Sequence, residues 1–371
     1  MELKQNIQDI FDIANVKLNG NNPEDICVYD CEFYSRVLRK GSIGLGESYM
    51  DKLWDCKSLD KLFYRIFTSG LNKKAKNAKF FLRVIKSKLM NLQKKSKAYE
   101  IGRKHYDTGN NLYRNMLDKR MIYSCGYWKN AKNLDQAQEN KLDLICKKIG
   151  LKPGMKILDI GCGWGGFAKY AAEKYKVEVV GITISKKQEE FAKKICRGIP
   201  VEIRLQDYRN LDEKFDRIIS IGMFEHVGPK NYRTYFKKVS QCLKPGGLFL
   251  LHTIGKDFSS NSIDPWINKY IFPNAVLPSA KQITFSAEGL FVLEDWHNFG
   301  IDYDKTLMAW ENNFSRNWNK IKKDKNYDER FYRMWKYYLL SCAGSFRARV
   351  NHVWQIIFSK NGVKGGYKSI R

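Results

Sequence analysis

The chain has 371 residues, of which 43% are hydrophobic and 14% aromatic, so it can bury a core and is neither disordered nor collagen-like. Its 66 Lys and Arg residues against 39 Asp and Glu residues leave a net charge of +27, which favours nucleic acid or an anionic membrane surface as partner. No window approaches the roughly 18 apolar residues of a spanning helix, and the start of the chain lacks the apolar run of a signal peptide. We therefore expect a cytoplasmic protein that touches membranes without crossing them.

The cysteines are scattered along the chain, and no two of them form a Cys-x-x-Cys pair. This pattern predicts neither a disulfide framework nor a zinc site, and we expect no metal. They stand at positions 27, 31, 56, 125, 146, 162, 196, 242 and 342.

The length predicts more than one domain. Residues 1–75 mix short apolar runs with turn signals, as expected of a small N-terminal module. The segment 72–104 holds twelve Lys or Arg residues and one acid, Glu100, for a net charge of +11. Its apolar residues recur at helical spacing, so we interpret 76–104 as a basic amphipathic linker. Such a helix either packs on a neighbouring domain or lies on an anionic lipid surface, and the two are compatible.

The remaining segment, 105–371, has the rhythm of a parallel doubly wound sheet. Helices are predicted at 168–175 and 186–196. A stretch from 259 to 290, with three prolines and several aromatic residues, interrupts the rhythm and is interpreted as an inserted cap. Strands are predicted at 156–160, 177–182, 201–205, 217–221, 248–252, 291–296 and 352–358.

A glycine-rich turn follows the first of these strands, in the string ILDIGCGWGG at 157–166. Glycines let the backbone turn tightly and approach a ligand closely. Asp159 suits the ammonium group of an amino acid better than a pyrophosphate, and no carboxylate ends the second strand, where a ribose-binding acid would stand. Thr183 can still bond a ribose hydroxyl, and Asp207 can accept from an adenine amino group. We interpret the turn as an S-adenosylmethionine site in a Rossmann-like class I methyltransferase fold, with a purely structural turn as the alternative.

Several long strings identify a resemblance that covers nearly the whole chain. They are GSIGLGESYM (41–50), HYDTGN (105–110), YSCGYW (123–128), GMFEHVG (222–228), DPWINKYIFPN (264–274) and SCAGSFRAR (341–349). In these strings the chain resembles the bacterial cyclopropane fatty acid synthases of the mycolic acid cyclopropane synthase superfamily.

The resemblance implies methylene transfer from S-adenosylmethionine to a cis double bond. An alkene is a poor nucleophile, and its attack on the sulfonium methyl leaves a carbocation, so the site needs a dry acyl channel, groups that tolerate positive charge, and a base. The family is thought to use a bound bicarbonate ion as that base. The resemblance maps its cage onto Cys125, Glu225, His252 and Tyr303 with the Ile254 backbone, at the carboxyl edge of the sheet, and Cys342 is a further catalytic candidate of less weight.

The cofactor contacts that the resemblance implies join those read from the turn. The full set is Tyr123, Ser124, Asp159, Gly161, Gly163, Thr183, Gln188 and Asp207.

Each catalytic candidate also has a structural interpretation. His252 ends an apolar strand, where a histidine is more often a satisfied core group. His226 follows Glu225 and competes for its role, although adjacent side chains usually point apart. Tyr303 stands in a polar loop, where a tyrosine is as often a packing residue, and Cys125 and Cys342 are typical buried thiols.

We therefore expect a phospholipid cyclopropane synthase at the inner face of an anionic membrane, with no nucleic acid partner. The N-terminal module would engage lipid or the second subunit of a homodimer. One alternative is a methyltransferase for RNA or another polyanion, although the chain lacks the Asn-Pro-Pro-Tyr-like loop of many base methylases. The other is a membrane-surface protein that binds S-adenosylmethionine without turnover. Within the family, methylation or hydration of the double bond stays open.

Overall fold

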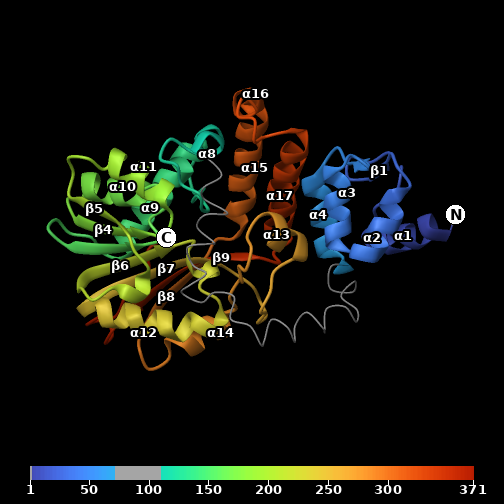
Figure 1. Cartoon of the computed structure of the whole chain (residues 1–371). Coiled ribbons are helices and arrows are strands. Elements are labelled where there is room, and N and C mark those ends of the chain that lie inside the picture. Colours follow the sequence, from blue (N-terminus) through green and yellow to red (C-terminus); the bar gives the residue numbers. More distant parts are fainter. Residues whose placement is uncertain (1, 72–109) are drawn as a thin grey trace. The chain divides into compact units, whose positions relative to one another are not determined.

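The computed structural model describes residues 2–71 and 110–371, which form two compact units. The N-terminal unit comprises residues 2–71, Ser262–Pro273 and Tyr303–Asn351. The sheet unit comprises residues 110–261, Asn274–Asp302 and His352–Arg371. Figure 1 colours the chain along its sequence, so the segments of each unit can be followed there.

The sheet unit contains, within the described residues, a seven-stranded sheet of order β5-β4-β3-β6-β7-β9-β8. Strands β3 to β7 are parallel to one another, as the strand and helix rhythm predicted. Their bounds are β3 (Lys156–Ile160), β4 (Glu178–Thr183), β5 (Val201–Leu205), β6 (Phe215–Ile221) and β7 (Leu243–Gly255). The connecting helices are α10 (Gly166–Tyr175), α11 (Lys186–Ile195) and α12 (Tyr232–Cys242).

The last two strands complete the sheet in the reverse direction. The sequence predicted that the sheet resumes near 291 and again near 352, and β8 (Val292–Asn298) and β9 (His352–Ser359) confirm this. However, β9 lies between β7 and β8 and is antiparallel to both. The sequence did not anticipate this reversal, because an apolar run identifies a strand without giving the direction in which the chain re-enters the sheet.

The two faces of the sheet bury different helices, because successive residues of a strand point to opposite faces. Ile157 of β3 packs in a cluster with α10 and with α9 (Leu134–Lys148). Leu158 and Ile160 of the same strand pack with α12 and with α14 (Ala280–Ala287). Helices therefore cover both faces (Figure 1), and each fully buried aliphatic side chain contributes about 1.5–3 kcal/mol to folding.

The N-terminal unit is not confined to the first part of the chain. It differs from the predicted segments 1–75, 76–104 and 105–371, of which 76–104 lies outside the described residues, because helices from far along the chain belong to it. The predicted cap at 259–290 is likewise divided, since its first helix belongs to this unit and α14 to the sheet unit. The elements of the unit are α1 (Glu2–Asp12), β1 (Cys27–Val28), α2 (Glu32–Lys40), α3 (Ser42–Met50), β2 (Trp54–Asp55), α4 (Leu59–Thr68), α13 (Pro265–Tyr270), α15 (Ile301–Arg316, from Tyr303 onward), α16 (Trp318–Ile321) and α17 (Glu329–Arg347).

Close packing explains this grouping. Gly46 of α3 lies so near Trp266 of α13 that a Cβ at this position would come within 2.4 Å of the indole. From α17, the Arg333 guanidinium lies 3.8 Å from the centre of the Tyr49 ring, and its Nη2 donates to the carbonyl of Trp54 at 2.9 Å. The N-terminal helices therefore share a core with α13 and α17.

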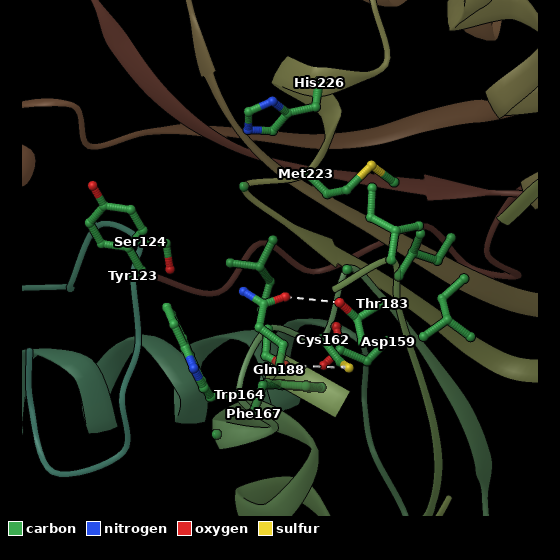
Figure 2. A pocket seen from close by; sticks show the side chains of 18 of the residues that line it. Tyr123, Ser124, Asp159, Cys162, Trp164, Phe167, Thr183, Gln188, Met223 and His226 are labelled. Atoms are coloured by element: carbon green, nitrogen blue, oxygen red, sulfur yellow. Dashed lines mark hydrogen bonds between the residues drawn. The ribbon is translucent and has the colours of Figure 1, made fainter. Parts of the chain in front are cut away.

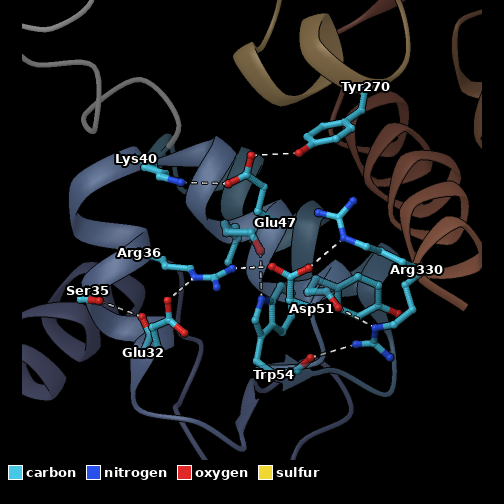
Figure 3. A network of polar contacts seen from close by, with 12 residues as sticks. Glu32, Ser35, Arg36, Lys40, Glu47, Asp51, Trp54, Tyr270 and Arg330 are labelled. Carbon is cyan, nitrogen blue, oxygen red and sulfur yellow. Dashed lines mark hydrogen bonds and ion pairs between the residues drawn. The ribbon is translucent and has the colours of Figure 1, made fainter.

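A polar network supports the same packing (Figure 3). Glu47 of α3 is buried, and its Oε1 accepts from Lys269 Nζ at 2.6 Å and from the Tyr270 hydroxyl at 2.9 Å, both on α13. Its Oε2 accepts from Lys40 Nζ at 3.1 Å. Burial alone would raise the pKa of Glu47, but these donors lower it to about 2.

None of the described helices combines the length and the apolar character of a membrane-spanning segment.

Replacing Glu47 by Gln should therefore destabilise the protein by about 1–3 kcal/mol at neutral pH, measured as a lower urea midpoint. Because the folded-state pKa of Glu47 is depressed, its stabilisation is complete above pH 4.5 and is lost as the pH falls toward about 2. The deficit of the variant should shrink over that window. The matched control is Glu32→Gln, whose carboxylate is half exposed and pairs with Arg36, and it should cost less than about 0.5 kcal/mol. Equal destabilisation by the two variants would contradict a stabilising role for the hydrogen bonds of the buried Glu47 carboxylate.

Candidate active site

A pocket in the sheet unit lies at the carboxyl ends of β3, β4, β5 and β6 (Figure 2), where ligands of open α/β sheets bind. The structure brings all the residues of the predicted cofactor set into its lining, although they come from separate loops. These residues are Tyr123, Ser124, Asp159, Gly161, Gly163, Thr183, Gln188 and Asp207.

The turn after β3 forms one wall of this pocket. Gly161 has a φ of +81°, in the region that favours glycine. A Cβ there would also lie 2.8 Å from Cβ of Met223, which lines the same pocket. Any other residue would be strained and would push the loop after β6 away.

Local hydrogen bonds hold the polar side chains of the wall beyond β4. Thr183 Oγ1 donates to Gln188 Oε1 at 2.8 Å, as Figure 2 shows. The Ser185 hydroxyl caps α11 by accepting a hydrogen bond from the backbone N–H of Gln188. After β5, the Asp207 carboxylate is paired with the Arg209 guanidinium through two bonds of 2.8 Å. These contacts fix a hydroxyl and a carboxylate on the pocket wall before any ligand arrives.

Asp159 is a buried acid in the pocket lining. It is 1% exposed, and no described residue bonds its Oδ2. Burial raises the pKa of this carboxyl to about 7, and the charge of Lys141 opposes that rise. A buried acid with an unused oxygen suits a ligand that brings its own positive donor, such as an ammonium group.

Aromatic rings stand behind the Tyr123 side of the pocket. Tyr113, from α8 (Asn110–Met116), lies 5.2 Å from the Tyr123 ring and 4.6 Å from the Trp164 ring, between ring centres. The Trp164 indole N–H donates to Asn110 Oδ1 at 2.9 Å. Aromatic rings therefore back the Tyr123 side of the pocket.

The lining also contains residues that the sequence reasoning missed or gave little weight, among them Lys141, Trp164 and His226. No signal in the sequence marked Lys141, because a lysine in a helix is normally exposed, and only the structure shows it buried on α9 beside Gln138 and Leu142. His226 could not be separated from Glu225 by sequence, but the structure places His226 in the pocket lining and Glu225 outside it.

Glu225 lies in a short 3₁₀ turn, Phe224–His226, and is buried. Its Oε1 accepts from the Ile254 backbone N–H at 2.7 Å, so that donor is already in use. Its Oε2 is buried without a hydrogen-bond partner among the described residues. Burial raises the pKa of Glu225 to about 7, so near neutral pH a large fraction of the carboxyl is protonated.

The sequence predicted that His252 ends its strand. It lies within β7 instead, because residues 252–255 remain paired with β9. Its Nδ1 faces the Gln355 amide nitrogen at 3.4 Å, which leaves the ring proton on Nε2. Burial holds the pKa of His252 well below its usual value, so the ring is neutral. Its carbonyl accepts from the Gly222 amide, which joins the end of β6 to β7.

The loop of Cys125 meets this same end of β6. A Cβ at Gly222 would lie 3.8 Å from that of Ser124, the residue before Cys125. Tyr127 and His252 both contact the Phe299 ring, at 5.5 and 5.8 Å between centres. The Cys125 thiol is buried and donates to the Gly126 carbonyl at 3.2 Å. The structure thus gathers Cys125, Glu225 and His252 around the ends of β6 and β7.

The two other catalytic candidates belong to the N-terminal unit. Tyr303 lies in the first turn of α15, not in a polar loop, because Tyr303, Leu307 and Trp310 form a buried stripe at helical spacing. Its ring packs on Phe346 at 4.6 Å between centres. Burial raises the pKa of the Cys342 thiol to about 12, which disfavours a nucleophilic role. Among the described residues, no group of acidic, His and Cys side chains could hold a metal ion.

We predict that neither His226 nor His252 gains a proton between about pH 6 and 8. Burial disfavours the imidazolium, lowering the pKa of His226 to about 4 and that of His252 well below its usual value. NMR of ¹⁵N-histidine-labelled protein should show both rings in the neutral form throughout, while the urea-unfolded chain titrates near pH 6.5. A midpoint between pH 6 and 7 for either ring in the folded protein would contradict this.

The amino-acid sequence matches a known protein family. The family model of mycolic acid cyclopropane synthetase matches residues 93–356 of this chain. The cyclopropane-fatty-acyl-phospholipid synthase of Escherichia coli strain K12 is 54% identical over 364 residues, which cover 98% of this chain and 94% of that protein.

Solved structures of cyclopropane synthases have a similar fold. A Mycobacterium tuberculosis cyclopropane synthase superposes with a TM-score of 0.66 and 30% identity, over 71% of this chain and 98% of that one. A mycolic acid cyclopropane synthase solved with SAH and CTAB has a TM-score of 0.65 and 32% identity, over the same shares. The chain, with its class I methyltransferase fold, belongs to the mycolic acid cyclopropane synthetase family.

Proposed function

We propose that the protein transfers a methylene group from S-adenosylmethionine to the cis double bond of an unsaturated acyl chain in a membrane phospholipid, forming a cyclopropane ring. The observation that carries the proposal is the pocket at the carboxyl edge of the sheet, which joins Asp159, Thr183 and Asp207 around the Gly161 turn. Family membership supports the same reaction, since the E. coli relative is a cyclopropane-fatty-acyl-phospholipid synthase.

The residues of the pocket explain how the cofactor would be held. Asp159 receives the ammonium of its amino-acid end, Thr183 a ribose hydroxyl, and Asp207 the adenine amino group. The π bond of the acyl chain then attacks the sulfonium methyl, S-adenosylhomocysteine leaves, and a carbocation remains on the chain. Loss of a proton from the transferred methyl closes the ring. The aromatic side of the pocket suits this cationic path, because ring faces attract positive charge.

The residues around Glu225 suit a small anion. The unpartnered Glu225 Oε2 can donate a proton to an anion in the protonated form that burial favours, and the neutral His252 offers Nε2–H. Bicarbonate held there by Cys125, Glu225, His252 and the Ile254 backbone would supply the base for ring closure. Since Glu225 already occupies the Ile254 N–H, the Ile254 contact would be made by way of that carboxyl.

The setting of the reaction follows from charge. A net charge of +27 attracts the protein to anionic phospholipid surfaces, with about 1 kcal/mol for each basic residue near the surface. Peripheral binding at the inner face of the membrane, a homodimer, and a lipid-binding or dimer-forming role for the N-terminal unit complete the proposal. Nucleic acid is not part of it.

The first test uses S-adenosylmethionine with a CD₃ methyl group and vesicles of cis-unsaturated phospholipid, read by mass spectrometry of the acyl chains. Ring closure should leave two of the three deuteriums on the chain, because one is lost as the departing proton. Retention of all three would indicate methylation or hydration instead. Unchanged lipid with the cofactor bound would favour the polyanion methyltransferase.

In the same assay, Glu225→Gln should lower turnover roughly a hundredfold or more, because an amide cannot exchange a proton with the bound anion. The matched control is Glu178→Gln, an exposed change at the start of β4, and it should leave turnover unchanged. Full activity of Glu225→Gln would remove Glu225 from the mechanism.

Membrane binding gives a separate prediction. Sedimentation with anionic vesicles should retain the protein at about 50 mM salt and release most of it at about 500 mM, because salt shortens the range of the attraction. Vesicles of zwitterionic lipid should bind much less at either salt concentration. Equal binding to both kinds of vesicle would exclude charge as the cause of attachment.

A further inference from the structure

The lining of the pocket contains a buried lysine that the proposed mechanism does not use. Lys141 of α9 is 0% exposed, and it lines the pocket together with Ser124 and Asp159. A buried ammonium is costly unless it is paired. Its presence beside a ligand pocket therefore needs a partner.

The hydrogen bonds of Lys141 do not satisfy its charge. An ammonium group has three donors, and among the described residues only the Ser124 hydroxyl accepts from it, at 2.8 Å. Burial lowers the pKa of Lys141 to about 8, while the nearby Asp118, Cys125 and Asp159 favour the charged form. At neutral pH the group is therefore mainly a cation with unused donors.

The acidic residues near Lys141 do not accept hydrogen bonds from its unused donors. Asp118 is occupied by two backbone amides, since its Oδ1 accepts from Ile122 at 2.8 Å and its Oδ2 from Arg120 at 2.9 Å. Asp159 interacts with Lys141 through its charge, but no hydrogen bond between them is found within the described residues. The pocket lining thus places a buried acid, Asp159, and a buried cation, Lys141, near each other, each with unused hydrogen-bonding capacity.

Ser124 is held firmly at the same place. Gln138, one turn before Lys141 on α9, is fully buried and donates to the Ser124 carbonyl at 2.8 Å. Because the Ser124 hydroxyl accepts from Lys141, its own proton remains available to a second acceptor. Lys141 and Ser124 together offer donors from a fixed position.

We propose that Lys141 binds the carboxylate of the amino-acid end of S-adenosylmethionine, while Asp159 binds its ammonium group. An α-amino acid carries both charges on one carbon, so a buried pair of opposite charges recognises it as a unit. This inference rests on the proposed cofactor. It adds that Lys141 and Ser124 select ligands that carry the carboxylate.

The test compares three ligands by isothermal titration calorimetry with the full-length protein. They are S-adenosylhomocysteine, its decarboxylated analogue, which keeps the amine, and 5′-methylthioadenosine, which has neither group. Lys141→Met should weaken S-adenosylhomocysteine binding roughly ten- to a hundredfold, because a charge-assisted hydrogen bond is lost. The same variant should leave the decarboxylated analogue unchanged or bind it more tightly, because the repulsion between Lys141 and its lone positive charge is removed. Methylthioadenosine should be unaffected.

A matched control lies on the same helix. Lys148 is also buried, but it is paired with His297 Nδ1 at 3.0 Å and does not line the pocket. Lys148→Met should leave the affinities of all three ligands within about twofold. If Lys141→Met does not fold, Lys141→Gln keeps a side chain that can bond Ser124 and removes the charge, and it should show the same selective loss.

The outcomes separate the two proposals. Equal weakening of all three ligands in the Lys141 variants would mean that the residue only supports the fold, and it would overturn the inference. A wild-type protein that binds none of the three ligands would instead overturn the proposed cofactor. The opposite responses of S-adenosylhomocysteine and its decarboxylated analogue are what a purely structural lysine cannot produce.

Discussion

The left-handed turn at Gly161 is the constraint on which the pocket depends. With a φ of +81° and Met223 Cβ within 2.8 Å of where a side chain would begin, the turn lets the loops after β3 and β6 approach each other. That approach brings Asp159 at the end of β3 and His226 beyond β6 into one lining. The parallel strands matter for the same reason, because their carboxyl ends all open at one edge of the sheet.

Several ionisable groups of the sheet unit are buried. Asp159 and Glu225 are both nearly free of solvent contact, and burial raises the pKa of each to about 7, whereas burial keeps His252 neutral. A reaction that passes through a cation in an apolar channel benefits from groups whose charge can change at little cost. Under the proposed function, fixed polar groups such as the Glu225 carboxyl and the His252 ring would take the place of water, which would quench such a cation.

The N-terminal unit shows how close packing can join distant parts of a chain. Gly46 admits the Trp266 indole, and the buried Glu47 bonds Lys269 and Tyr270 of the same helix. The string at 41–50 thus has a structural purpose within this unit. Tyr303 and Cys342, two of the sequence-predicted catalytic residues, belong to it as well.

By itself the sequence determined the parallel α/β core, the positions of its strands, and the cofactor contacts at Asp159, Gly161, Gly163, Thr183 and Asp207, because apolar runs and a glycine-rich turn are local patterns with few alternatives. Tyr123, Ser124 and Gln188 were predicted from the resemblance to a known family. Tertiary structure alone decided that β9 runs antiparallel, that Tyr303 is helical, and that α13 and α17 pack with the first helices, since each depends on contacts between distant segments. Lys141 belongs to the second group. A lysine in a helix is normally exposed, and only packing on all sides shows that this one is buried beside Asp159.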